Sequence, residues 1–114
     1  MPGQRIPDAV VELIAAYRRL LEGRLGSRLL SLRLFGSFSR GDADVDSDVD
    51  VAVVVQALTE SERSDAIDLA YAAWKLDTSK PTLSPLVWSE AEFEERLRTE
   101  RRIVADILTE GVLM

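Results

Sequence analysis

The sequence predicts an α+β fold, in which flanking helices cover a small mixed β-sheet. Two short segments of alternating apolar residues indicate β-strands, and longer segments with helical spacing precede and follow them. The resulting order of elements is α-β-β-α-β-α(α), with the final helix interrupted. A chain of 114 residues has room for one domain, so residues 1–114 are expected to form a single unit.

The first half of the chain is expected to supply one helix and two strands. The helix runs from Pro7 to about Gly23, because apolar residues recur at helical spacing between a proline and a glycine. Residues 29–35 form the first strand, with Leu30, Leu32 and Leu34 on one face. The stretch 36–47 is rich in Gly, Ser and Asp and is expected to be a loop or a short turn of helix. Residues 48–55 form the second strand.

Two capping boxes divide the second half. Thr59 and Glu62 open a helix that runs to about Leu76, and Ser89 and Glu92 open a second helical segment that runs to Gly111, with a break near Thr99. The strand between them, Leu83 to Trp88, contains Pro85 and is therefore expected to lie at a sheet edge or to be irregular.

Three further groups of apolar residues are expected in the core or in contact surfaces. The helical spacing of Ile67, Tyr71 and Trp74 predicts that they form a core face, and Trp88 is expected in the core or in an interface. The apolar tail 112–114 is expected to pack back on the domain or to take part in a subunit contact.

The composition excludes several kinds of chemistry. The chain has no cysteine and no histidine, which removes thiolate nucleophiles, imidazole bases and zinc sites of the usual type. Any metal must be bound through oxygen, as Mg²⁺, Mn²⁺ and Ca²⁺ are. The net charge of −6 argues against general nucleic-acid binding. No apolar run approaches the length of a membrane span and no signal segment is evident, so a cytoplasmic location without membrane contact is expected.

Asp48 and Asp50 are the first candidate ligands. They stand two residues apart at the start of an apolar strand, so both carboxylates face the same side, with Cα atoms roughly 6.5–7 Å apart. Such a pair repels unless a cation lies between the two groups. The pattern suits one divalent ion or two bridged ions, although the same dipeptide spacing also occurs in solvated turns.

Gly36 and Ser37 follow the first strand directly and are the second candidate. Glycine lets a ligand approach the backbone, and the amide and hydroxyl of Ser37 would face an anion if a helix begins there. Arg40 would add a positive charge near bound phosphate. A plain strand-to-helix turn is the alternative. If the two strands are neighbours, this turn and the aspartates meet at one end of the sheet, as a metal–nucleotide complex requires.

Gly36-Ser37, the ten residues 38–47, and Asp48-Val49-Asp50 together resemble the signature of the DNA polymerase β-like nucleotidyltransferase superfamily, and within it the minimal nucleotidyltransferase (MNT) branch. The resemblance implies a polymerase-β-like nucleotidyltransferase fold and a Mg²⁺ cofactor, with Mn²⁺ as an alternative and ATP as the substrate. It also implies site residues, namely the catalytic metal ligands Asp48 and Asp50 and the nucleotide-binding residues Gly36, Ser37, Arg40 and Ser47.

The same resemblance implies a reaction and a partner. Short MNT proteins resemble antitoxins of HEPN–MNT toxin–antitoxin pairs, and the implied chemistry is transfer of AMP from ATP to a hydroxyl of a HEPN-type toxin. The chain departs from the family at the third strand, where Ser84 falls at a position that is acidic in fully equipped members. Asp44, Asp46, Asp77 and Glu90 would replace that acid only if folding brings one of them to the pair.

This departure keeps other interpretations open. The alternative function is a catalytically weak or inactive module that neutralises a partner protein by contact. A small-molecule acceptor is disfavoured, because no segment remains to form an acceptor domain. A homodimer and a heteromeric complex are both compatible with a domain of this size.

Overall fold

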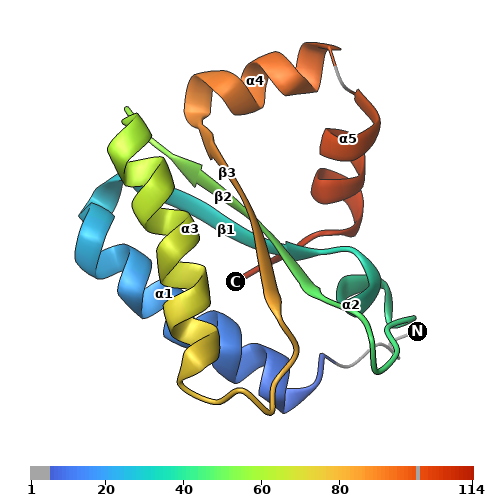
Figure 1. Ribbon diagram of the computed structural model, residues 1–114. Coiled ribbons are helices and arrows are strands. Elements are labelled where there is room, and N and C mark those ends of the chain that lie inside the picture. The colour runs from blue at the N-terminus through green and yellow to red at the C-terminus, as the bar shows by residue number, and fades with distance from the viewer. Residues whose placement is uncertain (1–5, 100) are drawn as a thin grey trace.

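The computed structural model describes residues 6–99 and 101–114, and its elements follow the predicted order (Figure 1). They are α1 (Asp8–Leu25), a 3₁₀ turn η1 (Gly26–Arg28), β1 (Leu29–Phe35), α2 (Ser37–Arg40), β2 (Val49–Val55), α3 (Glu60–Lys75), β3 (Leu83–Ser89), α4 (Glu90–Thr99), α5 (Arg101–Glu110) and β4 (Val112–Leu113). The α+β class is confirmed. The interrupted helix is also confirmed as α4 and α5, and residue 100 between them lies outside the described residues.

The strands form one mixed sheet in the order β3-β2-β1-β4. β2 is parallel to β3, and β1 is antiparallel to both β2 and β4. The strand that contains Pro85 is an edge strand, as expected for a residue that cannot donate to a neighbour. β2 lies inside the sheet, and every one of its residues except Asp50 is buried. A partly exposed carboxylate on the central strand therefore stands out as a functional candidate.

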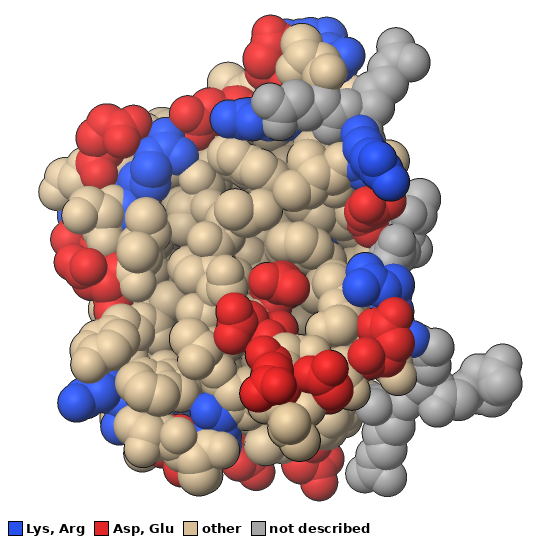
Figure 2. Space-filling view, turned by 45° about the vertical axis from the view of Figure 1, so that its right-hand side comes forward, with Lys and Arg blue, Asp and Glu red and all other residues tan. Residues whose placement is uncertain are grey.

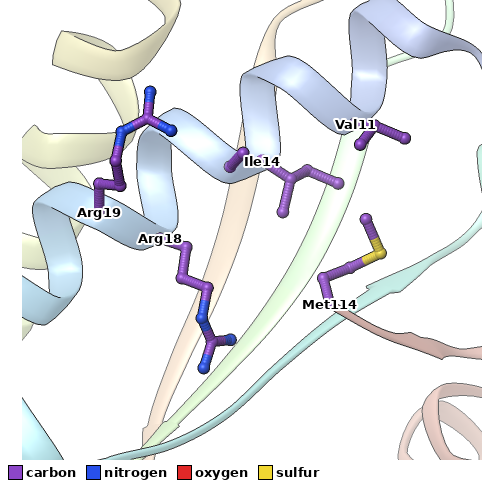
Figure 3. A pocket seen from close by; sticks show the side chains of 6 residues that line it. Val11, Ile14, Arg18, Arg19 and Met114 are labelled. Atoms are coloured by element: carbon purple, nitrogen blue, oxygen red, sulfur yellow. The ribbon is translucent and has the colours of Figure 1, made fainter.

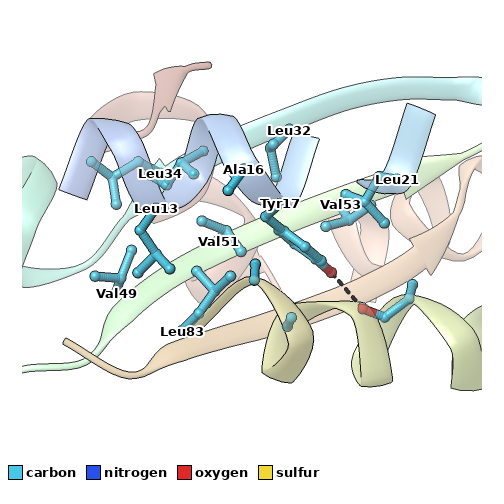
Figure 4. Packing of buried hydrophobic residues seen from close by; sticks show 14 of the residues in the cluster. Leu13, Ala16, Tyr17, Leu21, Leu32, Leu34, Val49, Val51, Val53 and Leu83 are labelled. Atoms are coloured by element: carbon cyan, nitrogen blue, oxygen red, sulfur yellow. Dashed lines mark hydrogen bonds between the residues drawn. The ribbon is translucent and has the colours of Figure 1, made fainter. Parts of the chain in front are cut away.

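α1 and α3 cover one face of the sheet and α4 and α5 lie on the other (Figure 1). The main core forms between α1, α3 and the sheet, where Tyr17 donates a hydrogen bond of 2.8 Å to the carbonyl of Ala66 and so joins the two helices (Figure 4). Burial raises the pKa of Tyr17 above its usual range. A smaller core on the opposite face contains Ala52, Trp88 and Ile107, which confirms the core position of Trp88.

The two capping boxes are confirmed. Glu62 N donates to Thr59 Oγ1 at 3.1 Å, and Thr59 N donates back to Glu62 Oε1 at the same distance. Ser89 and Glu92 make the equivalent pair of bonds at the start of α4. Each box satisfies two backbone groups that a helix start leaves open.

Two predicted details in the first half are wrong. α1 continues past Gly23 to Leu25, and Gly26, whose φ is +61°, follows it. The two additional residues include Leu25, which is buried one helical turn after the buried Leu21, and this burial outweighs the low helix propensity of a glycine. In β1, Leu32 and Leu34 are fully buried but Leu30 is 43% exposed, because the pairing with β2 shifts register there.

The predicted core face of α3 is confirmed only for Trp74, which is partly buried and packs against the main core. Ile67 is 50% and Tyr71 is 60% exposed, while the buried face consists of Ala66, Ala70 and Ala73. The two stripes are offset by one residue, and the small alanines allow α3 to approach its neighbours closely. β4 has no counterpart among the elements expected from the sequence. The apolar tail packs back on the domain by pairing with β1, and Met114 N donates to Leu32 O at 2.8 Å.

Candidate nucleotide and metal site

Gly36 and Asp50 lie against each other, so the structure brings together the two halves of the sequence motif. The β1–β2 pairing sets Phe35 opposite Asp50, and Gly36 follows directly with a φ of +76°. A Cβ atom added at Gly36 would overlap the carboxylate of Asp50. A glycine is therefore required here for two reasons: the backbone conformation and the space that the carboxylate occupies.

The stretch after Gly36 is the short turn of helix that the sequence analysis allowed for. In α2, the amides of Ser39 and Arg40 both donate to Gly36 O at 3.1 Å, and the hydroxyl of Ser39 donates to the same oxygen at 2.9 Å. The turn closes at Gly41, which adopts a φ of +82°. Within the described residues, the amides of Ser37 and Phe38 have no acceptor, so two donors remain beside Gly36.

The two aspartates differ in their surroundings. Asp48 is exposed and directly precedes β2, whereas Asp50 is half-buried within the strand. Burial raises the pKa of Asp50 above its ordinary value, the charge of Asp48 raises it further, and the charge of Arg40 lowers it. The three side chains therefore act on one another electrostatically, and a cation held by the two carboxylates would favour the charged form of both.

Arg40 and Ser47 lie at the rim of this site. Arg40 is 46% exposed and forms an ion pair with Asp42 at 3.2 Å. Ser47 has a local role: its hydroxyl accepts from the amide of Asp44 at 2.9 Å and lies 3.3 Å from the carboxylate of the same residue. These bonds hold the loop that ends at Asp48, directly before β2.

β3 flanks β2 on the side away from β1, and there Ser84 is the neighbour of Asp50. In the parallel pairing of β2 and β3, Ser84 stands opposite Asp50, and paired residues share a face of the sheet. Within residues 6–99 and 101–114, no three acidic, histidine or cysteine side chains form a group able to hold a metal. Asp44, Asp46, Asp77 and Glu90 thus form no three-carboxylate group with the aspartate pair, and the residue opposite Asp50 carries a hydroxyl.

The loop before β2 gives the site a negative field. Five aspartates occupy alternate positions from residue 42 to residue 50. Figure 2 shows acidic side chains gathered low on the face that carries this loop, beneath a stretch with few charges. A field of this sign attracts cations and repels a free anion.

A model of the nucleotidyltransferase domain family matches residues 18–113, a range that includes the glycine-serine turn and both aspartates. The chain belongs to this family. It is also similar to a protein of Methanocaldococcus jannaschii that is named "Putative protein adenylyltransferase", with 36% identity over 62 residues. That alignment covers 54% of this chain and 63% of the relative, so the similarity extends over less than two thirds of the relative's length.

A solved structure described as a "putative nucleotidyltransferase" from Sulfolobus solfataricus is similar to the nucleotidyltransferase domain. The match covers 99% of this chain and 90% of that one, with 19% identity and a TM-score of 0.48.

Across the part of the chain that the structure describes, no helix combines the length and the apolar character needed to span a membrane.

Two features of this candidate site could not be predicted from the sequence. The sequence placed Ser84 near the aspartates only by resemblance, and the β2–β3 register now places it directly opposite Asp50. The requirement for glycine at residue 36 was attributed to a ligand, whereas the Asp50 carboxylate already enforces it. The signal for both was the strand register, which a single sequence does not contain.

Proposed function

We propose that this nucleotidyltransferase is an MNT-type protein adenylyltransferase, which transfers AMP from ATP to a hydroxyl of a partner protein. The acceptor in this proposal is a HEPN-type toxin, and the chain is its antitoxin. The observation that carries the proposal is the contact of Gly36 with Asp50, which places two free amides beside a carboxylate pair. The printed name of the Methanocaldococcus relative supports a protein as the acceptor.

The donor set of the site fits a hard divalent cation. Asp48 and Asp50 offer carboxylate oxygens, and burial together with the charge of Asp48 raises the pKa of Asp50, so a bound cation would offset the cost of its charged form. The two aspartates would hold Mg²⁺, with Mn²⁺ as the alternative. When bound, this ion would supply charge neutralisation at the phosphate oxygens where charge develops.

The residues of the chain bind and orient the substrate. The amides of Ser37 and Phe38 and the hydroxyl of Ser37 would bind the terminal phosphates, and Arg40 would offset their charge. The acidic loop repels a free triphosphate, so the site favours the metal complex of ATP. In the reaction, the acceptor oxygen bonds to the α-phosphorus, the bond from that phosphorus to the bridging oxygen breaks, pyrophosphate leaves, and the hydroxyl proton passes to water.

A second candidate function is neutralisation of the partner by contact without transfer. The observation that favours it is the hydroxyl of Ser84 at the position opposite Asp50, where a third carboxylate would complete a metal site. In this case, the domain would bind nucleotide weakly or not at all, and its surface would inhibit the partner.

Calorimetric titration of MgATP tests the proposal. We expect binding to the wild type that requires Mg²⁺ and is lost in Asp48→Asn. The matched control is Asp46→Asn, which removes the same charge from an exposed position of the same loop. Equal binding to the wild type and to both variants would refute the assigned site.

Intact-mass measurement of the toxin after incubation with MgATP then separates the two candidates. An added AMP group that depends on Asp48 supports transfer. An unmodified toxin whose activity is nevertheless inhibited supports neutralisation by contact.

A further inference from the structure

A hollow of about 250 Å³ lies between α1 and the end of β4 (Figure 3). Its lining consists of Val11, Ile14, Ala15, Arg18, Arg19 and Met114. Figure 3 shows Val11 and Ile14 on α1 facing Met114, with Arg18 one turn further along the helix. Ile14 is buried, whereas Val11 is 41% exposed, so the hollow has an apolar floor that is open on one side.

The hollow adjoins a free sheet edge. β4 is the last strand in the sheet order, and Met114 N donates inward to Leu32 O at 2.8 Å. Because successive amides of a strand point to opposite sides, the N–H and C=O of Leu113 point outward. The side chain of Leu113 is 68% exposed, and within the described residues no strand pairs with this edge. This short edge therefore offers the N–H and C=O of Leu113 as a pairing position for an added strand.

Two arginines give the hollow a positive rim in a chain of net charge −6. Arg18 pairs with Glu22 at 3.2 Å within one helix, and because this pair is exposed it exchanges readily for another carboxylate. Arg19 is exposed and forms no ion pair with any described residue. The rim is therefore complementary to an acidic group and the floor to an apolar one.

We propose that this groove binds an extended acidic segment of a partner protein, which adds a strand to the outer edge of β4. Every second side chain of that strand would fall on the α1 side of the sheet. One of these side chains is apolar and fills the hollow, and an acidic residue two positions away, about 7 Å along the strand, meets the arginines.

A second copy of this chain fits the groove less well. Its own β4, Val112–Leu113, and the Met114 that follows are apolar, and the nearest acid, Glu110, belongs to helix α5 rather than to an extended strand. The groove lies on the α1 side of the sheet, whereas Asp50 alternates with the core valines and faces the other side. A segment bound there leaves the nucleotide site open, so the inference does not depend on the proposed activity.

Selection from a library of random decapeptides displayed on phage tests the docking surface without knowledge of the partner. We expect the wild type to enrich sequences with an acidic residue two positions from an apolar one. Synthetic copies should bind at least tenfold more weakly to Arg18→Gln/Arg19→Gln. The matched control is Arg98→Gln/Arg102→Gln, which removes two exposed charges from α4 and α5 and should leave affinity unchanged.

Leu113→Pro isolates the contribution of the strand edge. Proline removes the outward N–H and leaves the inward bond of Met114 intact, so peptide affinity should again fall at least tenfold while the melting temperature is nearly preserved. Enriched peptides without acids, or affinities that both variants leave unchanged, would overturn the proposal. So would a dimer, seen in sedimentation, that depends on Arg18 and Arg19, because the occupant would then be a second copy.

Discussion

Asp50 and Ser84 stand opposite each other across the parallel pairing of β2 and β3, on the face of the sheet that is away from α1. The residue next to the half-buried carboxylate is therefore an exposed hydroxyl on an edge strand. Asp50 thus has no carboxylate opposite it on β3, and Ser84 is open to solvent.

Ser84→Asp should strengthen divalent cation binding. A third carboxylate beside Asp50 adds an oxygen ligand and a negative charge, and we expect Mn²⁺ to bind about tenfold more tightly, a change of about 1.4 kcal/mol. Calorimetric titration of Mn²⁺ measures the change. Ser61→Asp introduces the same charge at an exposed position of α3 and is the control. Equal affinities in the two variants would show that Ser84 does not border the metal position.

Asp50→Asn should stabilise the fold in the absence of divalent cations. The folded state raises the pKa of Asp50, so at neutral pH it disfavours the charged form that the unfolded state accepts freely. The gain in melting temperature should be present at pH 7 and should disappear as the pH falls and Asp50 is protonated in both states. Thermal unfolding over a pH series measures it. A variant that melts below the wild type at pH 7 would contradict this account.

Addition of Mg²⁺ should reverse the order of the two proteins. The wild type gains stability because the cation binds only the folded state, whereas Asp50→Asn has lost a ligand and gains little. Asp46→Asn, in the same loop, should respond to Mg²⁺ as the wild type does.

Gly36→Ala should destabilise the domain and displace Asp50. The new Cβ would overlap the carboxylate, and the φ of +76° is a conformation that alanine rarely adopts. We expect a loss of about 1–3 kcal/mol in the free energy of unfolding. Gly23→Ala is the contrasting control: it lies inside α1 with open space around it, and there alanine should stabilise by about 0.5–1 kcal/mol. Chemical denaturation of both variants measures these changes. An unchanged free energy of unfolding in Gly36→Ala would show that movement of the neighbouring atoms relieves the overlap.

The sequence predicted the element order because each element carries its own local signal. Both capping boxes begin helices where expected, and Pro85 marks an edge strand. The errors arise where tertiary contacts override local pattern. β4 is only two residues long and exists because β1 offers it an edge, and the exposed Tyr71 follows from the alanines that α3 buries instead.

The candidate site was likewise predicted only in part. The glycine-serine turn and the paired aspartates were predicted from residue type and spacing, and the structure brings Gly36 and Asp50 together. The position of Ser84 and the bonds of Ser47 within its loop depend on register and on backbone path. No pattern in the sequence specifies either of them.

Glu62 should make the stability of the domain depend on acid pH. Its carboxylate is buried, it caps α3, and it accepts a hydrogen bond of 3.0 Å from Arg28 of the 3₁₀ turn η1. The Arg28 guanidinium and the amide of Thr59 lower the pKa of Glu62 to about 2. Because the folded pKa lies below the unfolded one, the stabilisation is complete above about pH 4.5 and is lost as the pH falls toward 2.

Glu62→Gln separates this contribution from general acid unfolding. The variant should be less stable than the wild type at pH 7, and the difference should shrink steadily between pH 4.5 and pH 2 as the wild-type carboxylate is protonated. Urea denaturation at each pH measures the difference. Glu60→Gln removes a carboxylate that is 84% exposed two residues away and should change stability little at any pH. A Glu62→Gln deficit that stays constant with pH would mean that packing of the side chain, rather than its charge, stabilises the junction of α3 with η1.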